Sequence, residues 1–254
     1  MKFISPVAII VALLINPFAN AQETYLKHQS KLTQGKAGDS TTNTALLKSG
    51  AFVGCVDYKI TYKGLDTENK GQQENIDFLI KNSSENYGRE RTYCFNEYGD
   101  WLHIYRDAKQ IDKIWYFAET NEEYTLFKNG VMKFSVNNEA EPEGFEELSI
   151  KNLEVTEETK MILGYKSRQI VLEIESGTKT EYWVSDELQR NQTSYQYNKF
   201  AYMNEIMSFV KGVHLYQKKT VADFFVTIEE AVSIRFELPD QELFILPNVD
   251  LYHW

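Results

Sequence analysis

Apolar and polar residues alternate along most of the chain after residue 51, at the two-residue spacing typical of β-strands. The clearest run covers residues 52–62, whose even-numbered positions form one apolar face. Further strands are predicted over 75–81, 87–95, 101–106, 113–119, 124–127, 153–162, 165–175, 178–184, 213–218, 223–229 and 232–238. These closely spaced strands, without regularly intervening helices, indicate an antiparallel meander.

Residues 198–211 break the alternation and predict one helix. Asn198 is a suitable N-cap and Gly212 a suitable terminator. The apolar residues of this segment occupy most faces of the predicted helix, which is typical of a buried helix. We interpret them as core, and as a binding surface if a ligand displaces the helix; they include Phe200, Met203, Ile206, Met207 and Val210.

A curled sheet around this helix satisfies both patterns. The sequence therefore predicts a mainly β (α+β) fold, in which a curled antiparallel sheet forms an open half-barrel around a helix. We expect one such domain over residues 49–254. Residues 22–48 are polar and have no aromatic residue between Tyr25 and Phe52, so they predict a flexible leader.

The first 21 residues have the parts of a cleavable secretory signal. Lys2 supplies a positive start, Val7–Ile15 is apolar, and Ala19 and Ala21 are small residues before the expected cleavage point. The apolar run is too short to span a bilayer of about 30 Å. We expect cleavage near Ala21 and a periplasmic or secreted protein, soluble and without a transmembrane span in its mature form.

The charge balance excludes some partners. The chain has 27 Lys and Arg against 37 Asp and Glu, a formal net charge of −10. A nucleic-acid-binding protein needs a basic stripe to replace the phosphate counterions, so no nucleic-acid partner is expected.

The two cysteines, Cys55 and Cys94, have two interpretations. An even number of cysteines in an exported protein favours a disulfide. The other interpretation is two separate buried thiols, because cysteine is often buried in strands. Their spacing matches no metal-binding motif, so no metal is expected.

No motif of a known catalytic machinery is present, including the GxSxG elbow, HExxH, the P-loop and GxGxxG. Of the four histidines, His28, His103, His214 and His253, only His103 and His214 lie where folding could join them. We favour surface or satisfied strand positions for them. The sequence predicts no enzyme and no cofactor, and a desolvated carboxylate beside a histidine is the observation that would favour an enzyme.

Three short segments carry a family resemblance. Glu157–Lys160 leads into Ile162–Arg168 (ILGYKSR), Glu181–Ser185 (EYWVS) follows, and Phe244–Pro247 (FILP) comes near the end. Over about residues 52–250 the chain resembles uncharacterised exported envelope proteins of Gram-negative bacteria, related to GLPGLI-type domains of unknown function. The resemblance implies a fold similar to the LolA and LolB lipoprotein carriers, in which an unclosed barrel holds acyl chains.

The function predicted from these observations is non-enzymatic binding of a lipid acyl chain or another hydrophobic small molecule, as a carrier or sensor. Strand aromatics would line the site together with the helix residues named above; they are Tyr58, Phe78, Trp115 and Trp183. The alternative is an interaction module with a side-chain-filled core, which binds an envelope protein through a sheet edge or its outer face.

Overall fold

The computed structural model describes residues 51–65, 70–136, 150–191, 203–221, 224–249 and 251–252. The predicted signal (1–21), the predicted leader (22–48) and Phe200 lie outside these ranges. Strands dominate the described chain: β1 (Gly54–Gly64), β2 (Glu90–Phe95), β3 (Trp101–Tyr105), β4 (Ile111–Phe117), β5 (Glu122–Phe127), β6 (Met132–Val136), β7 (Ile150–Ile162), β8 (Tyr165–Ile174), β9 (Lys179–Gln189), β10 (Gly212–Val221), β11 (Phe225–Arg235) and β12 (Leu251–Tyr252). The helices are α4 (Lys70–Tyr87), α5 (Met203–Phe209) and the 3-10 turn η5 (Gln241–Phe244).

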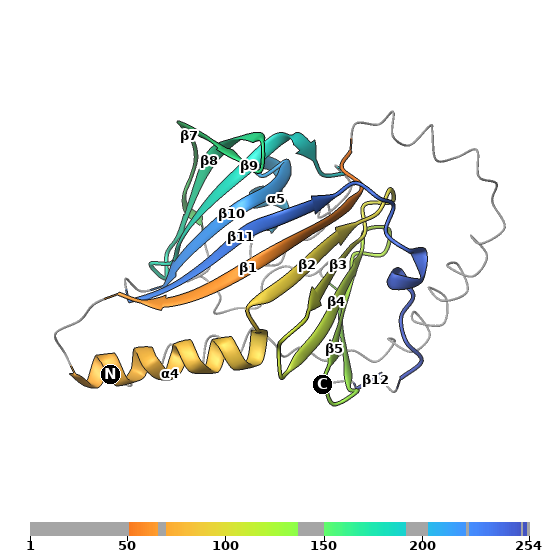
Figure 1. The fold of residues 1–254 in the computed structure, drawn as a ribbon, viewed down its shortest axis with the longest axis horizontal. Coiled ribbons are helices and arrows are strands. Elements are labelled where there is room, and N and C mark those ends of the chain that lie inside the picture. Colours follow the sequence, from red (N-terminus) through yellow and green to blue (C-terminus); the bar gives the residue numbers. More distant parts are fainter. Residues whose placement is uncertain are drawn as a thin grey trace.

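The described strands form one sheet in the order β12-β6-β5-β4-β3-β2-β1-β11-β10-β9-β8-β7 (Figure 1). Neighbouring strands are antiparallel except for β12, which pairs parallel with β6. The predicted mainly β, antiparallel, open and curled sheet is therefore confirmed. Two meanders, β1–β6 and β7–β11, meet where β1 pairs with β11 along nearly its whole length.

The end of β9 shows how far the sheet curls. Three strands separate β9 from β2 in the sheet. Nevertheless, the Asn191 side-chain amide donates to the Glu97 carbonyl at 3.0 Å. The Arg190 guanidinium lies 5.4 Å from the centre of the Phe95 ring. These contacts form because the sheet bends back until the end of β9 reaches the end of β2.

Strand alternation divides the side chains between two faces. On the first, which we name the α5 face, Tyr58 and Tyr93 belong to one large cluster. Ile206 of α5 and Val210, the residue that follows α5, pack there against β8 and β9 residues in a second cluster that also includes Ile170, Leu172 and Val184. Helix α5 is the described part of the helix predicted over 198–211, and it covers part of this face.

The opposite face carries its own apolar cluster under the C-terminal segment. Phe244 and Leu246 are buried there against β2–β5 residues that include Leu102, Phe117 and Tyr124. The segment that follows β11 thus covers this face of the first meander. The FILP residues supply the two apolar side chains of that cover.

Residues 75–81, predicted as a strand, lie within helix α4 instead, so that prediction is wrong. Ile76, Phe78 and Ile80 alternate as in a strand, but Ile76 and Ile80 are also one helical turn apart. Ile76 is fully buried and Phe78 is 60% exposed. An added Cβ at Gly64 would stand only 2.2 Å from Ile76 Cγ2, so this glycine lets α4 approach β1 closely. None of the described helices is long and apolar enough to cross a membrane.

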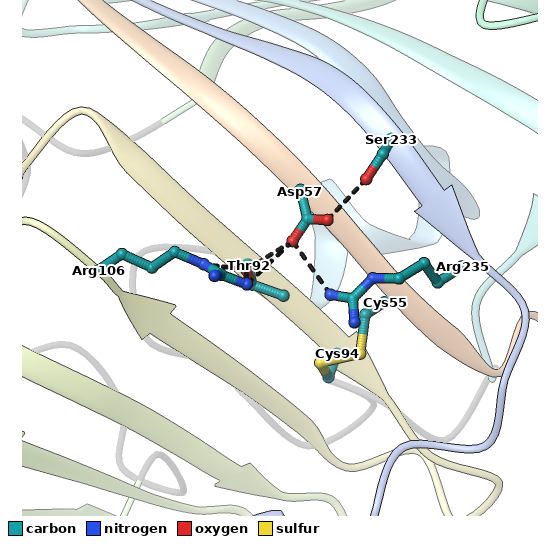
Figure 2. The surroundings of a disulfide bond; sticks show 7 residues. All are labelled: Cys55, Asp57, Thr92, Cys94, Arg106, Ser233 and Arg235. Carbon is teal, nitrogen blue, oxygen red and sulfur yellow. Dashed lines mark hydrogen bonds and ion pairs between the residues drawn. A yellow bond between two sulfur atoms is a disulfide. The ribbon is translucent and has the colours of Figure 1, made fainter.

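Cys55 and Cys94 form a disulfide between directly paired residues of β1 and β2, on the face opposite α5 (Figure 2). The structure therefore has the disulfide rather than the two separate buried thiols, the alternative that the sequence left open. Beside it, the Asp57 carboxylate accepts hydrogen bonds from Ser233 and Thr92 at 2.6 Å each, and from Arg235 at 3.1 Å. These contacts fasten β1 to both of its neighbours.

Replacing Ile76 by Ala should lower the free energy of unfolding by about 2–4 kcal/mol, because it empties a buried site between α4 and β1. Replacing Phe78 by Ala should change it by less than about 0.5 kcal/mol, because that side chain is exposed. Urea unfolding of both variants measures the difference. In a strand the two residues would share one face, so equal losses would contradict the helix.

Reduction of the Cys55–Cys94 disulfide should lower the free energy of unfolding by about 2–4 kcal/mol, since it releases a loop constraint on the unfolded chain. The check is urea unfolding of the oxidised protein against the Cys55→Ser/Cys94→Ser double variant. Equal midpoints would show that the β1–β2 pairing needs no covalent support.

Candidate functional site

A row of aromatic rings crosses the α5 face from β4 to β10. Successive ring centres along it are 5.4, 4.1, 3.7, 4.7 and 5.1 Å apart, within or below the usual range for aromatic pairs. We call this set the aromatic row; its members in order are Tyr116, Trp101, His103, Tyr93, Tyr58 and His214.

The row crosses β11 because that strand has a small residue at the crossing point. Ala231 of β11 pairs with Tyr58 of β1. With only a methyl group beside it, the Tyr58 ring reaches over β11 to stack on His214 of β10. The Tyr58 hydroxyl then donates to the His214 carbonyl at 2.5 Å. One tyrosine thereby connects the two meanders on this face.

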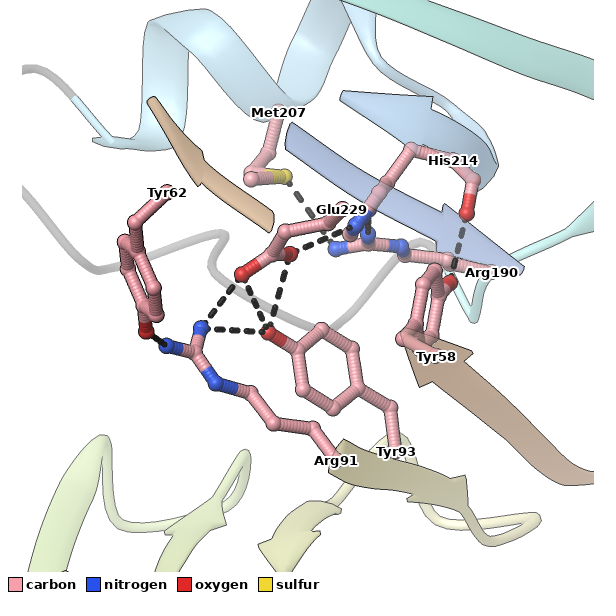
Figure 3. A network of polar contacts seen from close by, with 8 residues as sticks. All are labelled: Tyr58, Tyr62, Arg91, Tyr93, Arg190, Met207, His214 and Glu229. Carbon is pink, nitrogen blue, oxygen red and sulfur yellow. Dashed lines mark hydrogen bonds and ion pairs between the residues drawn. The ribbon is translucent and has the colours of Figure 1, made fainter. Parts of the chain in front are cut away.

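A buried carboxylate, Glu229 on β11, lies beside the row (Figure 3). It forms an ion pair with Arg91 on β2. The Tyr93 hydroxyl donates to Glu229 Oε2 at 3.1 Å, and His214 Nε2 lies 3.4 Å from the same oxygen. Arg91 in turn donates to the Tyr62 hydroxyl at 3.1 Å. Groups from β1, β2, β10 and β11 thus meet around one negative charge.

These partners keep Glu229 ionised. Burial raises its pKa, but the Arg91 charge and the hydrogen bonds from His214 and Tyr93 outweigh burial and lower the pKa to about 2. Burial lowers the pKa of His214 and holds the pKa of His103 well below its ordinary value. Near neutral pH the cluster therefore has an ionised glutamate and two neutral histidines.

The contacts of His214 fix which ring nitrogen carries the proton. Arg190 Nη2 lies 3.3 Å from His214 Nδ1, and a guanidinium can only donate. Nδ1 is therefore the acceptor and Nε2 carries the hydrogen that points to Glu229. A relay of hydrogen bonds runs from Arg190 through His214 to Glu229, and both nitrogens of the imidazole are occupied.

This geometry is poorly suited to proton transfer. A carboxylate beside a histidine is the feature that would favour an enzyme, and the fold does bring Glu229 and His214 together. However, a general base works best with a pKa near the working pH, and the pKa of Glu229 is about 2. Both histidine nitrogens also have partners already. What the cluster provides is fixed charge and hydrogen-bond donors beside aromatic rings.

The residues predicted to line a site fall into three groups. Tyr58, Ile206, Met207 and Val210 share the α5 face, where Tyr58, Ile206 and Val210 are buried and Met207 is half-buried. Met203 lies in α5, but its side chain is outside the described set, as is the whole of Phe200.

The other three predicted residues do not reach the α5 face, so their assignment to a common site is corrected. Phe78 is exposed on α4 rather than inward-facing on a strand. Trp115 packs under the C-terminal segment, and its Nε1 donates to the Leu243 carbonyl at 2.8 Å. Trp183 follows Tyr182 by one residue on β9 and so points to the opposite face, where Lys160 lies 4.2 Å from its ring centre.

Sequence reasoning missed Arg91, Arg190 and Glu229 altogether. Arg91 and Glu229 are 138 residues apart, and only the β1–β11 pairing makes them neighbours. A local signal does exist, because Arg91 alternates with Tyr93 and Phe95 and must share their face. A charged residue on the apolar face of a predicted strand would have indicated a buried ion pair at this position.

Among the described residues, no group of three or more His, Cys, Asp or Glu is placed to hold a metal ion. No protein-family model matches the chain, and no curated protein matches it. Among solved structures, the chain is similar to PNGF-II in a C2 crystal form, with a TM-score of 0.40 and 17% identity over 78% of this chain. A P21 form gives 0.36 and 16% over 74%. The chain spans 31% and 30% of those chains, and likeness at this level says nothing about activity.

Replacing Glu229 by Gln should cost about 3–5 kcal/mol of unfolding free energy at neutral pH, because it leaves the Arg91 charge buried without its partner. Since the folded-state pKa is lowered, the carboxylate stabilises the fold above its ordinary pKa and loses this effect in acid. The difference in unfolding free energy between wild type and Glu229→Gln should therefore decrease as the pH falls from about 5 to about 2.

Urea unfolding across this pH range measures the difference. Glu230→Gln is the matched control, because Glu230 is the next residue on β11 and is exposed on the other face. A free-energy difference that does not change with pH would contradict the assigned role of Glu229. An equally large loss of stability in Glu230→Gln would contradict it as well.

Proposed function

We propose that the chain is an exported, non-enzymatic binding protein that holds a hydrophobic or amphiphilic ligand on the α5 face of its curled sheet. The observation that carries the proposal is the aromatic row, which runs unbroken through four strands of the first meander to β10. Such a row is a long aromatic surface beside a small number of fixed polar groups, the combination that lines most small-molecule sites. The resemblance to exported envelope proteins, which implies a fold similar to the LolA and LolB carriers, agrees with this proposal.

Helix α5 is the element through which a ligand would enter. Its described helical segment has seven residues, and a segment of this length depends on packing for its position. Met207 packs against both the row's cluster and the β8–β9 cluster, and so lies where the two meet. A methionine side chain adapts to varied apolar shapes at little cost. Displacement of Met207 would give a ligand access to both clusters.

A second candidate function, an interaction module with a side-chain-filled core, is favoured by a different observation. Tyr58 is 1% exposed and Tyr116 is fully buried, so the row is packed in this structure. In the described part of the chain, β7 pairs only with β8 and ends the sheet with an unpaired edge. An extended segment of an envelope protein could add to that edge.

Native mass spectrometry with solvent extraction tests the two candidates. The full chain is expressed with its own N-terminus and purified from a Gram-negative periplasm. We expect a stoichiometric bound lipid, which Met207→Asp should lose because a carboxylate would be placed between two apolar clusters. Phe78→Asp is the control and should keep the lipid, since Phe78 is exposed on α4.

A clean apo mass for the wild type would contradict the binding function and favour the interaction module. Retention of the lipid by a folded Met207→Asp variant would place the ligand away from α5. Far-UV circular dichroism of each variant separates loss of ligand from loss of fold.

A further inference from the structure

Arg190 is a charged side chain of the α5 face whose partners differ from those of Arg91. Arg91 has Glu229, and near neutral pH the histidines of the row are neutral. Arg190 is half-buried on the same face, and no carboxylate of the described residues lies within ion-pair distance of it. A charged group in such surroundings is normally paired, so Arg190 needs an explanation.

The present contacts of Arg190 are weak ones. One terminal nitrogen, Nη1, lies 3.4 Å from the Met207 sulfur, and thioethers are poor acceptors. The other, Nη2, donates to His214, and the Phe95 ring lies beside the guanidinium. The Nε–H is buried and has no hydrogen-bond partner among the described residues. The guanidinium therefore keeps donors that an oxyanion would satisfy in the two-pronged geometry that arginine favours.

The position of Arg190 indicates what the oxyanion is attached to. Arg190 Nη1 lies 3.4 Å from the Met207 sulfur, and the guanidinium lies 5.4 Å from the centre of the Phe95 ring. Since Met207 lies where the two apolar clusters of the α5 face meet, a group that replaces its sulfur at Arg190 has apolar surface next to it. This is the arrangement needed by an amphiphile whose charged end is recognised and whose chain is buried.

His214 holds the site in place. It accepts from Arg190 through Nδ1 and is itself held through Nε2 by Glu229, which Arg91 neutralises. The Arg190 side chain is thus positioned before any ligand arrives. The negative charge of Glu229 is already engaged by three partners, so it repels an incoming anion less than an unpaired carboxylate would.

We infer that Arg190 binds the anionic head group, a carboxylate or a phosphate, of an acyl-chain ligand, and that the Met207 side chain occupies the place of that ligand in this structure. This inference rests on the proposed function and adds the ligand class: an acyl chain that ends in an oxyanion. Arg190 is then the residue that distinguishes charged from neutral amphiphiles.

The test compares four probes of known structure by isothermal titration calorimetry: laurate, dodecyl phosphate, dodecanol and acetate. They are titrated, below their aggregation limits, into delipidated full-length protein at about 0.15 M salt. We expect laurate and dodecyl phosphate to bind at least about tenfold more tightly than dodecanol, as a charge-assisted bidentate contact predicts. Acetate should bind far more weakly than laurate.

Arg190→Gln should remove the preference for charged probes, so that laurate, dodecyl phosphate and dodecanol bind with similar affinities. Arg190→Lys, which keeps the charge without the two-pronged donor, should retain only part of the preference. Met207→Ala should bind laurate more tightly than wild type, because the ligand no longer displaces a side chain. Arg235→Gln, an exposed arginine on the opposite face, is the control and should behave as wild type.

The outcomes separate this inference from the function on which it rests. Equal binding of laurate and dodecanol by the wild type would overturn the role of Arg190 and leave the binding function standing. A preference that survives in folded Arg190→Gln and Arg190→Lys would place the oxyanion elsewhere. Acetate binding as tight as laurate would overturn the acyl-chain ligand. Failure of the wild type to bind any probe would overturn both proposals.

Discussion

The pairing of β1 with β11 is the constraint on which the rest of the structure depends. It joins a meander from the first half of the chain to one from the second, and it makes neighbours of residues about 140 positions apart. Arg91 and Glu229 meet only because of it. The Tyr58 ring can cross to β10 only because Ala231 is opposite it in this register. A register shift of one residue would turn the side chains of one of these strands to the other face and separate the pairs.

The buried charges of the α5 face illustrate how ionised side chains can be accommodated among aromatic and aliphatic residues. An isolated carboxylate at the position of Glu229 would be neutralised by protonation, because burial alone raises its pKa. The cluster avoids this by surrounding Glu229 with donors from separate strands, so that its charge costs less than protonation would. Arg190 has no such set of oppositely charged partners among the described residues. Its guanidinium contacts the Met207 sulfur and the His214 imidazole instead. The contrast between these two sites, only a few side chains apart, is the basis of the binding role that we propose for Arg190.

The sequence predicts the architecture well because strand alternation is a local property. Most strands of both meanders can be found from it, and so can the helix that contains Ile206. β6 (Met132–Val136) was not among the predicted strands, and β11 was predicted as two separate strands. Strand alternation fails at Ile76–Ile80, where three alternating apolar residues fit a strand and a helix equally, and only packing against Gly64 decides. It also misplaces Trp115 and Trp183, because alternation shows which residues share a face within a strand but not which face of the sheet α5 covers. The charged cluster could not be predicted, since its members come from strands whose pairing is set by the whole topology.

The same topology slows the completion of folding. The strands of the first meander follow one another closely in the sequence, and the disulfide to β2 secures one side of β1. The other side of β1 must wait for β11, which lies near the C-terminus, and until then it presents a long row of unpaired backbone groups. Contacts of such large sequence separation form slowly. During folding, the chain is therefore most exposed to pairing with another chain along β1, the strand that later joins the two meanders.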